Sequence, residues 1–142
     1  MDGGLHIVNA STGKEQSVFV PPEIITNQYD TLAGKDSKGV GSLSGIAYGV
    51  DAPWVADNTF KVQITKSGTT ATTKYVANKM NIYGGLRMGG SGLYGLDILS
   101  PASPKLLFQI KPTTTNEFQR MAQIWAKPTI AEIRVKDRKS VV

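Results

Sequence analysis

The residues with the chemistry for catalysis or metal binding are few in this chain. His6 is the only histidine and cysteine is absent, so a Ser-His-Asp triad or a histidine metal centre would depend on His6 alone. The aspartates Asp51, Asp57 and Asp97 lie far apart in sequence, and nothing in the sequence pairs them with a base. We therefore predict that the protein is not an enzyme and that it holds no metal ion and no cofactor.

Positive charge gathers in one internal segment of the chain. Residues 60–111 contain seven lysines and arginines against one acid, Asp97, which gives a net charge of +6. The remaining residues carry nine positive and ten negative side chains, and the whole chain has a net charge of +5. This placement is expected if the segment faces a polyanion, whereas a solvated face that keeps a sheet soluble explains it equally well.

The elements that must position these side chains are mostly strands. The 142 residues suit one domain, and 15 glycines and 7 prolines interrupt the chain too often for long helices. The segment that begins at Phe60 alternates Phe60, Val62 and Ile64 with Lys, Gln and Thr, the pattern of a sheet with one buried and one wet face. Residues 73–83 and 105–111 repeat this division and predict two further strands.

Other segments complete the predicted sheet. Residues 5–9 and 16–20 predict an opening β-hairpin, residues 26–42 predict a loop, and residues 43–50 predict another strand. Residues 84–95 are rich in glycine, and residues 90–95 match a dinucleotide-binding fingerprint. No helix follows them, so we interpret residues 84–95 as a flexible loop. No apolar run of about 18 residues and no leader is present, which predicts a soluble, unprocessed chain.

The clearest predicted helix covers residues 114–127. Thr114 and Glu117 fit a capping box at its start. Three large apolar residues follow at helical spacing, namely Phe118, Met121 and Trp125. Pro128 ends this helix, and residues 129–142 are compatible with either a second helix or a strand.

The order of these elements resembles the coat proteins of the single-stranded RNA bacteriophages. Residues 5–21 resemble the N-terminal hairpin of that family, residues 60–75 its central RNA-binding hairpin, and residues 110–118 the junction from the last strand to the first helix. The resemblance implies an α+β fold in a single coat-protein domain, residues 1–142. Its expected parts are an N-terminal hairpin (1–25), an antiparallel sheet of about five strands (43–111), a helix packed on a dimer partner (114–127) and a C-terminal segment (129–142).

The resemblance implies a viral capsid protein. Members of the family form homodimers that assemble into an icosahedral shell around genomic RNA, and several also bind an RNA hairpin and repress translation. The chain would then belong to a virion assembled in the cytoplasm of a bacterial host, with no membrane partner. The expected RNA-binding residues are Lys61, Gln63, Thr65, Asn78, Lys79, Lys105, Gln109 and Lys111, the last three by strand alternation alone. The expected dimer interface is the helix stripe Phe118, Met121 and Trp125.

Three other classes of protein stay open at this point. A phage decoration or tail protein without RNA binding shares the strand-rich composition, but it has no need to concentrate positive charge on inner strands. A small cellular RNA-binding module has no need of the long connections at residues 26–42 and 84–100. An enzyme is the weakest alternative, because the acids are scattered along the sequence.

Overall fold

The computed structural model describes residues 3–32 and 48–131, which form mostly antiparallel β-structure with a single short α-helix. A separate hairpin pairs β1 (Leu5–Val8) with β2 (Glu15–Phe19), and the helix α1 spans Pro22–Leu32. The main sheet has the strand order β3-β4-β5-β6. Its strands are β3 (Trp54–Ser67), β4 (Thr70–Gly84), β5 (Leu93–Asp97) and β6 (Lys105–Ile110), and a short 3-10 turn η2 (Arg87–Gly89) follows β4.

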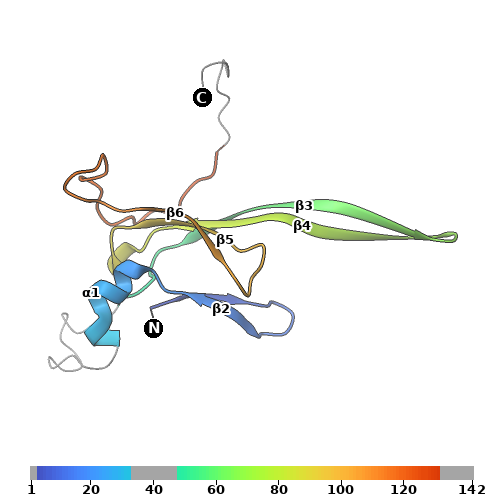
Figure 1. Cartoon of the computed structure of the whole chain (residues 1–142), viewed down its shortest axis with the longest axis horizontal. Coiled ribbons are helices and arrows are strands. Elements are labelled where there is room, and N and C mark those ends of the chain that lie inside the picture. The colour runs from blue at the N-terminus through green and yellow to red at the C-terminus, as the bar shows by residue number, and fades with distance from the viewer. Residues whose placement is uncertain (1–2, 33–47, 132–142) are drawn as a thin grey trace, which may run out of the picture.

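The strands β3 and β4 extend far beyond the rest of the sheet. They pair in antiparallel register from Trp54↔Gly84 to Ser67↔Thr70, whereas β5 pairs with β4 only through Asn81–Gly84. Residues 60–77 therefore project as a two-stranded ribbon, which we call the β3–β4 arm (Figure 1). Its turn is made by Gly68 and Thr69, and Gly68 adopts a left-handed φ of 60°, which glycine accepts without strain.

The core lies between α1 and the base of the sheet. Three buried apolar side chains cluster there: Ile24 from α1, Leu86 from the loop after β4, and Tyr94 from β5. Leu96 of β5 is buried as well. The rings of Phe19 and Tyr94 meet edge to face, with centroids 5.8 Å apart, and this contact ties the β1–β2 hairpin to the sheet. Figure 1 shows α1 and the hairpin together on one side of the sheet.

The predicted sheet and loops require two corrections. The main sheet contains four strands, not about five, because residues 48–50 form no strand and residues 43–47 lie outside the described part of the chain. The helix α1 occupies part of the segment predicted as a loop at residues 26–42. Pro22 suits the first helical position and Glu23 lies in the first turn, where a negative charge stabilises the helix dipole.

The helix predicted over residues 114–127 does not form. This segment consists of turns and irregular backbone, and residues 129–131 are likewise neither helix nor strand. The side chain of Asn116 accepts hydrogen bonds from the backbone N–H groups of Thr113 (3.2 Å) and Phe118 (3.1 Å), and it donates to the carbonyl of Lys111 (2.8 Å). These local bonds compete with the helical hydrogen-bond ladder, so the capping box is not realised.

No helix in the described part of the chain has both the length and the hydropathy that crossing a bilayer requires.

Candidate interaction surface

The β3–β4 arm carries two faces of different chemistry. Directly paired residues of antiparallel strands place their side chains on the same face. The pairs Phe60↔Ala77, Val62↔Tyr75 and Ile64↔Thr73 make the apolar face of the arm. The pairs Lys61↔Val76, Gln63↔Lys74 and Thr65↔Thr72 make its polar face.

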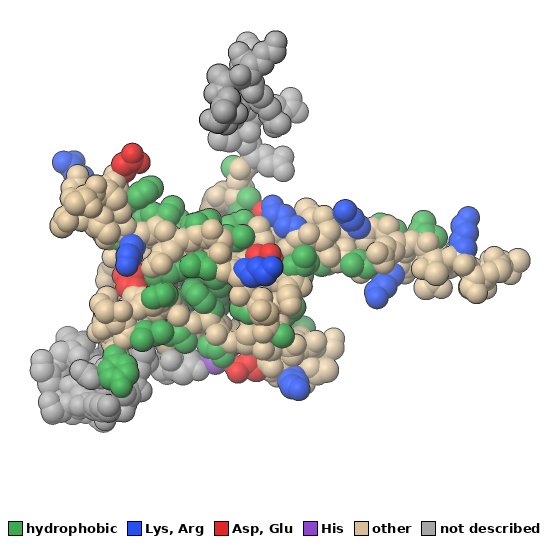
Figure 2. Space-filling model, viewed as in Figure 1, with side chains coloured by type: hydrophobic (Ala, Val, Ile, Leu, Met, Phe, Trp, Pro, Cys, Tyr) green, Lys and Arg blue, Asp and Glu red, His purple; other side chains and the backbone are tan. Residues whose placement is uncertain are grey.

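The apolar face of the arm is open to solvent. The exposed fractions are 54% for Phe60, 56% for Val62, 62% for Ile64 and 71% for Tyr75. A two-stranded ribbon has no second layer of its own to cover such a face. Contiguous exposed apolar side chains of this kind mark sites of interaction with other molecules. Figure 2 shows hydrophobic and lysine side chains along the arm, which stands clear of the body of the molecule.

The arm has positive charge and no negative charge. Lys61, Lys66 and Lys74 lie within residues 60–77, and the sequence contains no acid from residue 58 to residue 96. At the base of the arm, Lys79 forms an ion pair with Asp57. The arm therefore presents a local positive potential beside an exposed apolar face.

The structure separates the residues that were predicted to bind RNA. Lys61, Gln63 and Thr65 share the polar face of the arm, as the alternation predicted. Asn78 is the extra residue of a β-bulge between the pairs Thr59↔Lys79 and Phe60↔Ala77, and its Oδ1 accepts a hydrogen bond from Thr59 Oγ1 at 2.9 Å. The bulge shifts the side-chain parity of β4, which is why alternation alone could not orient this strand.

A second bulge changes the parity of β6. The register moves from Gly95↔Phe108 to Leu96↔Leu106, so Lys105 and Gln109 lie on opposite faces of the sheet. Lys105 is paired in register with Asp97, and Gln109 Nε2 donates a hydrogen bond to the hydroxyl of Tyr94 at 3.1 Å. The single basic face that was predicted for residues 105–111 is therefore wrong.

One carboxylate, that of Glu23, attaches the helix α1 to the glycine-rich segment, residues 84–95. Glu23 accepts hydrogen bonds from the backbone N–H groups of Ser91 (2.8 Å) and Gly92 (3.0 Å) and from the hydroxyl of Tyr94 (3.4 Å). A Cβ atom on Gly90 would lie 2.4 Å from the nearer carboxylate oxygen of Glu23, so glycine is needed for this approach. The segment that was predicted as a flexible loop is closely packed instead.

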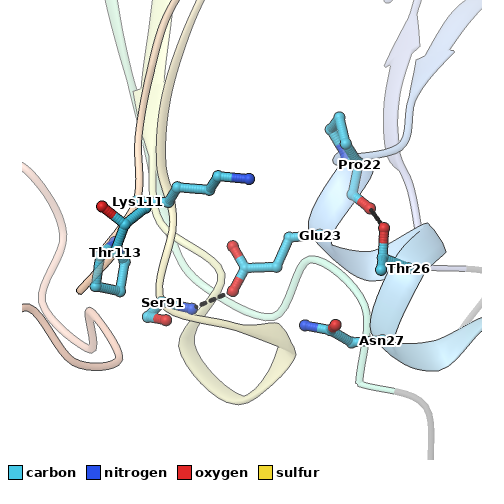
Figure 3. Close-up of a pocket in the computed structure, with 8 residues that line it drawn as sticks. Pro22, Glu23, Thr26, Asn27, Ser91, Lys111 and Thr113 are labelled. Carbon is cyan, nitrogen blue, oxygen red and sulfur yellow. Dashed lines mark hydrogen bonds between the residues drawn. The ribbon is translucent and has the colours of Figure 1, made fainter. Parts of the chain in front are cut away.

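A small pocket lies next to this carboxylate. It encloses about 320 Å³ between α1, the glycine-rich segment and the residues after β6. Figure 3 shows Lys111 extending toward Glu23 across it, with Ser91 and Thr26 at its border. The Glu23 carboxylate already accepts three hydrogen bonds from the protein, which stabilise the contact between α1 and the glycine-rich segment.

Burial raises the pKa of the Tyr94 phenol to about 12, and the neighbouring Glu23 carboxylate adds to the shift. Because the ordinary pKa is 10.0, an unfolded chain loses this proton at lower pH than the folded chain does. We expect the free energy of unfolding to be unaffected by this group below pH 10 and to fall by about 2 kcal/mol between pH 10 and 12. Urea unfolding near pH 8 and near pH 11.5 measures the loss, and Tyr94→Phe should remove it. An equal loss in that variant would contradict the assignment.

The residues predicted as a dimer interface do not form a stripe. Without the helix, Phe118, Met121 and Trp125 lie on irregular backbone. The Trp125 ring lies against the guanidinium of Arg87, whose Cζ atom is 4.6 Å from the centroid of the ring. Arg87 has a left-handed φ of 51° and lies 3.7 Å from the carboxylate of Asp51. The contact between Trp125 and Arg87 attaches the C-terminal segment to its own chain, and the helical stripe on which the predicted dimer interface depended does not form.

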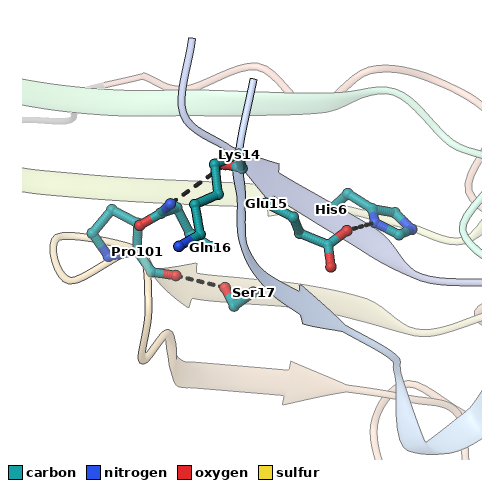
Figure 4. A network of polar contacts seen from close by, with 6 residues as sticks. All are labelled: His6, Lys14, Glu15, Gln16, Ser17 and Pro101. Carbon is teal, nitrogen blue, oxygen red and sulfur yellow. Dashed lines mark hydrogen bonds and ion pairs between the residues drawn. The ribbon is translucent and has the colours of Figure 1, made fainter. Parts of the chain in front are cut away.

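The residues with possible catalytic chemistry have structural partners. His6 pairs with Glu15 across the β1–β2 hairpin, and Ser17 Oγ donates a hydrogen bond to the carbonyl of Pro101 at 2.5 Å (Figure 4). Asp97 accepts the N–H of Leu99 at 2.9 Å. Within residues 3–32 and 48–131, no three His, Cys, Asp or Glu residues gather where they could hold a metal ion.

Comparison with known proteins finds a similarity to a pilus biogenesis factor. No model of a known protein family matches the chain. The chain is 30% identical over 133 residues, 93% of its length, to the type IV pilus biogenesis factor PilY1 of Pseudomonas aeruginosa (strain UCBPP-PA14), of whose length it spans 10%. The crystal structure of the Pseudomonas aeruginosa PilY1 C-terminal domain is 27% identical, with 77% of this chain and 17% of that chain covered and a TM-score of 0.39.

The sequence similarity to PilY1 overturns the resemblance to phage coat proteins. The coat-protein resemblance depended on three short stretches and on a helix that does not form, whereas the similarity to the pilus factor extends over 133 residues. Capsid assembly, RNA packaging, a homodimeric shell and a place in a virion were therefore wrong predictions, and the phage decoration protein is unsupported as well. The chain is similar in sequence to one part of a bacterial pilus biogenesis factor.

Proposed function

We propose that this chain is a non-catalytic module that acts in type IV pilus biogenesis. The observation that supports the proposal is the 30% identity to PilY1 over 93% of the chain. The chain spans 10% of that protein, so the proposal concerns one part of a pilus biogenesis factor and not its whole activity.

The arrangement of the described residues supports a binding role over a catalytic one. Asp57 pairs with Lys79, Asp97 caps a backbone N–H, and Glu23 fastens α1 to the glycine-rich segment. An acid that is committed to such a partner is poorly placed to exchange a proton with a substrate. The exposed apolar face of the arm, in contrast, has the character of a contact surface.

A chimera tests this function directly. In Pseudomonas aeruginosa, the 133-residue stretch of PilY1 that aligns with this chain is replaced by the chain itself. We expect the chimeric strain to assemble surface pili, because the module supplies the same structural part. Electron microscopy of the cells and immunoblots of sheared pilin measure the result.

Two control strains make the outcome interpretable. A strain that lacks the aligned stretch should assemble few pili, and a chimera with Leu86→Asp, which places a charge in the core, should behave like that deletion. If the unaltered chimeric protein accumulates at normal levels and resists proteolysis, yet the cells have no more pili than the deletion strain, the proposed function is wrong.

A further inference from the structure

The free edge of β3 lies beside the exposed apolar face of the arm. Among the described strands, β3 has a neighbour on one side only, so the backbone polar groups on its other side lack a strand partner along Trp54–Ser67. The edge of β4 is less regular, because the bulge at Asn78 lies in this strand at the base of the arm. The β3 edge is thus the more regular template for an added strand.

The side chains along β3 specify the chemistry of such a strand. Residues that pair with Phe60, Val62 and Ile64 would place their side chains on the apolar face, and residues that pair with Lys61 and Gln63 would place theirs on the polar face. The polar face carries Lys61 and, opposite Gln63, Lys74, with no acid on the arm. A complementary strand alternates apolar and acidic residues.

We propose that the β3 edge of the arm binds an extended protein segment in which apolar residues alternate with acidic ones. A second copy of the chain is a poorer occupant, because it would bring its own Lys61, Lys66 and Lys74 toward an arm of the same charge. A nucleic acid would neutralise the lysines but leave Val62 and Ile64 in water. This inference goes beyond the proposed function and does not depend on it.

The test uses the full chain and a labelled synthetic peptide of about ten residues, in which Val and Ile alternate with Glu and Asp. Fluorescence anisotropy measures binding at low salt and at about 0.5 M salt. We expect saturable binding that weakens with salt, because part of the attraction is electrostatic. A peptide with Lys in place of Glu and Asp should bind at least about tenfold more weakly.

Two neighbouring substitutions on β3 provide the matched comparison. Val62→Lys places a charge on the apolar face and should weaken binding of the acidic peptide at least about tenfold. Gln63→Lys adds the same charge to the polar face and should leave binding unchanged or make it tighter. Both positions are exposed, and circular dichroism checks that each variant keeps the fold.

Several outcomes would overturn the inference. One is no saturable binding of the acidic peptide, and another is equal binding by the two variants. A third is equal binding of the acidic and basic peptides, which would show that charge complementarity plays no part. If sedimentation shows a dimer that Val62→Lys dissociates, a second copy is the occupant. If an RNA oligonucleotide binds both variants as tightly as the acidic peptide does, the arm recognises negative charge alone.

Discussion

Replacing Gly89 with alanine is expected to destabilise the protein by more than about 3 kcal/mol, the largest effect we predict for a single methyl group. A Cβ atom on Gly89 would lie 1.7 Å from the carbonyl oxygen of Gly49 and 2.8 Å from its carbonyl carbon. Gly49 is itself packed against Gly3, since a Cβ atom added to Gly49 would lie 2.2 Å from the Cα atom of Gly3. Because all the atoms in contact belong to backbone, no side chain can rotate away to make room.

Urea unfolding of Gly89→Ala measures this loss, and Gly13→Ala is the matched control. Gly13 has a left-handed φ of 67° and nothing within 4 Å of its Cβ position, so alanine there costs only the backbone strain, about 1 kcal/mol. If the two variants are equally stable, the three glycine backbones do not pack as closely as the structure has them.

Replacing Glu23 with alanine is expected to lower the free energy of unfolding by about 3 kcal/mol. The substitution leaves the N–H groups of Ser91 and Gly92 and the hydroxyl of Tyr94 without their acceptor. Each part-buried donor that loses a charged partner costs about 1–3 kcal/mol, and neighbouring water recovers part of that. Without these hydrogen bonds, α1 should detach from the glycine-rich segment during unfolding before the β3–β4 arm is affected.

Thermal unfolding and hydrogen exchange together measure the effect of Glu23→Ala. Glu117→Ala removes a carboxylate from an exposed position and should change the stability by less than about 0.5 kcal/mol. Glu23→Gln keeps one acceptor oxygen and should fall between the two. A Glu23→Ala variant with the stability of Glu117→Ala would show that the carboxylate does not anchor the helix.

Local patterns predicted some of the strands of this protein and missed β5, which lies partly in the segment predicted as a loop. The alternation that begins at Phe60 and the turn at residues 67–70 predicted the β3–β4 hairpin, and residues 105–111 coincide with β6. Strand alternation is a short-range property, so it can be seen in sequence without knowledge of the neighbouring elements. The local signals for a helix, a capping box and apolar residues at helical spacing, failed at residues 114–127. There the side-chain hydrogen bonds of Asn116 outcompete a helix that has no packing partner.

Other features depend on contacts between distant segments. The helix α1 is held by bonds from Glu23 and Gln28 to residues more than sixty positions away, such as Ser91 and Gly89. Pro22 and Glu23 are a helix-start signal that could have placed α1, but the polar residues after them favoured a loop. The glycines of residues 84–92 suggested flexibility, although several are needed because other atoms approach them closely.

The two faces of the arm show a limit of strand alternation as a predictor. The pattern at Phe60, Val62 and Ile64 predicted one buried and one wet face, and the structure leaves both faces of the arm in solvent. A period of two divides a strand into faces but carries no information on what covers them. The bulges at Asn78 and between Gly95 and Leu96 add parity changes that only the strand pairing shows.

The most direct test of a pilus module that works through its arm is a count of surface pili in the chimeric Pseudomonas aeruginosa strain with either Val62→Lys or Gln63→Lys. We predict that the unaltered and Gln63→Lys chimeras assemble similar numbers of pili and that Val62→Lys reduces the number about tenfold. Equal numbers in the two variants would contradict the role of the arm. An absence of pili in all three strains, with stable chimeric protein, would contradict the proposed function itself.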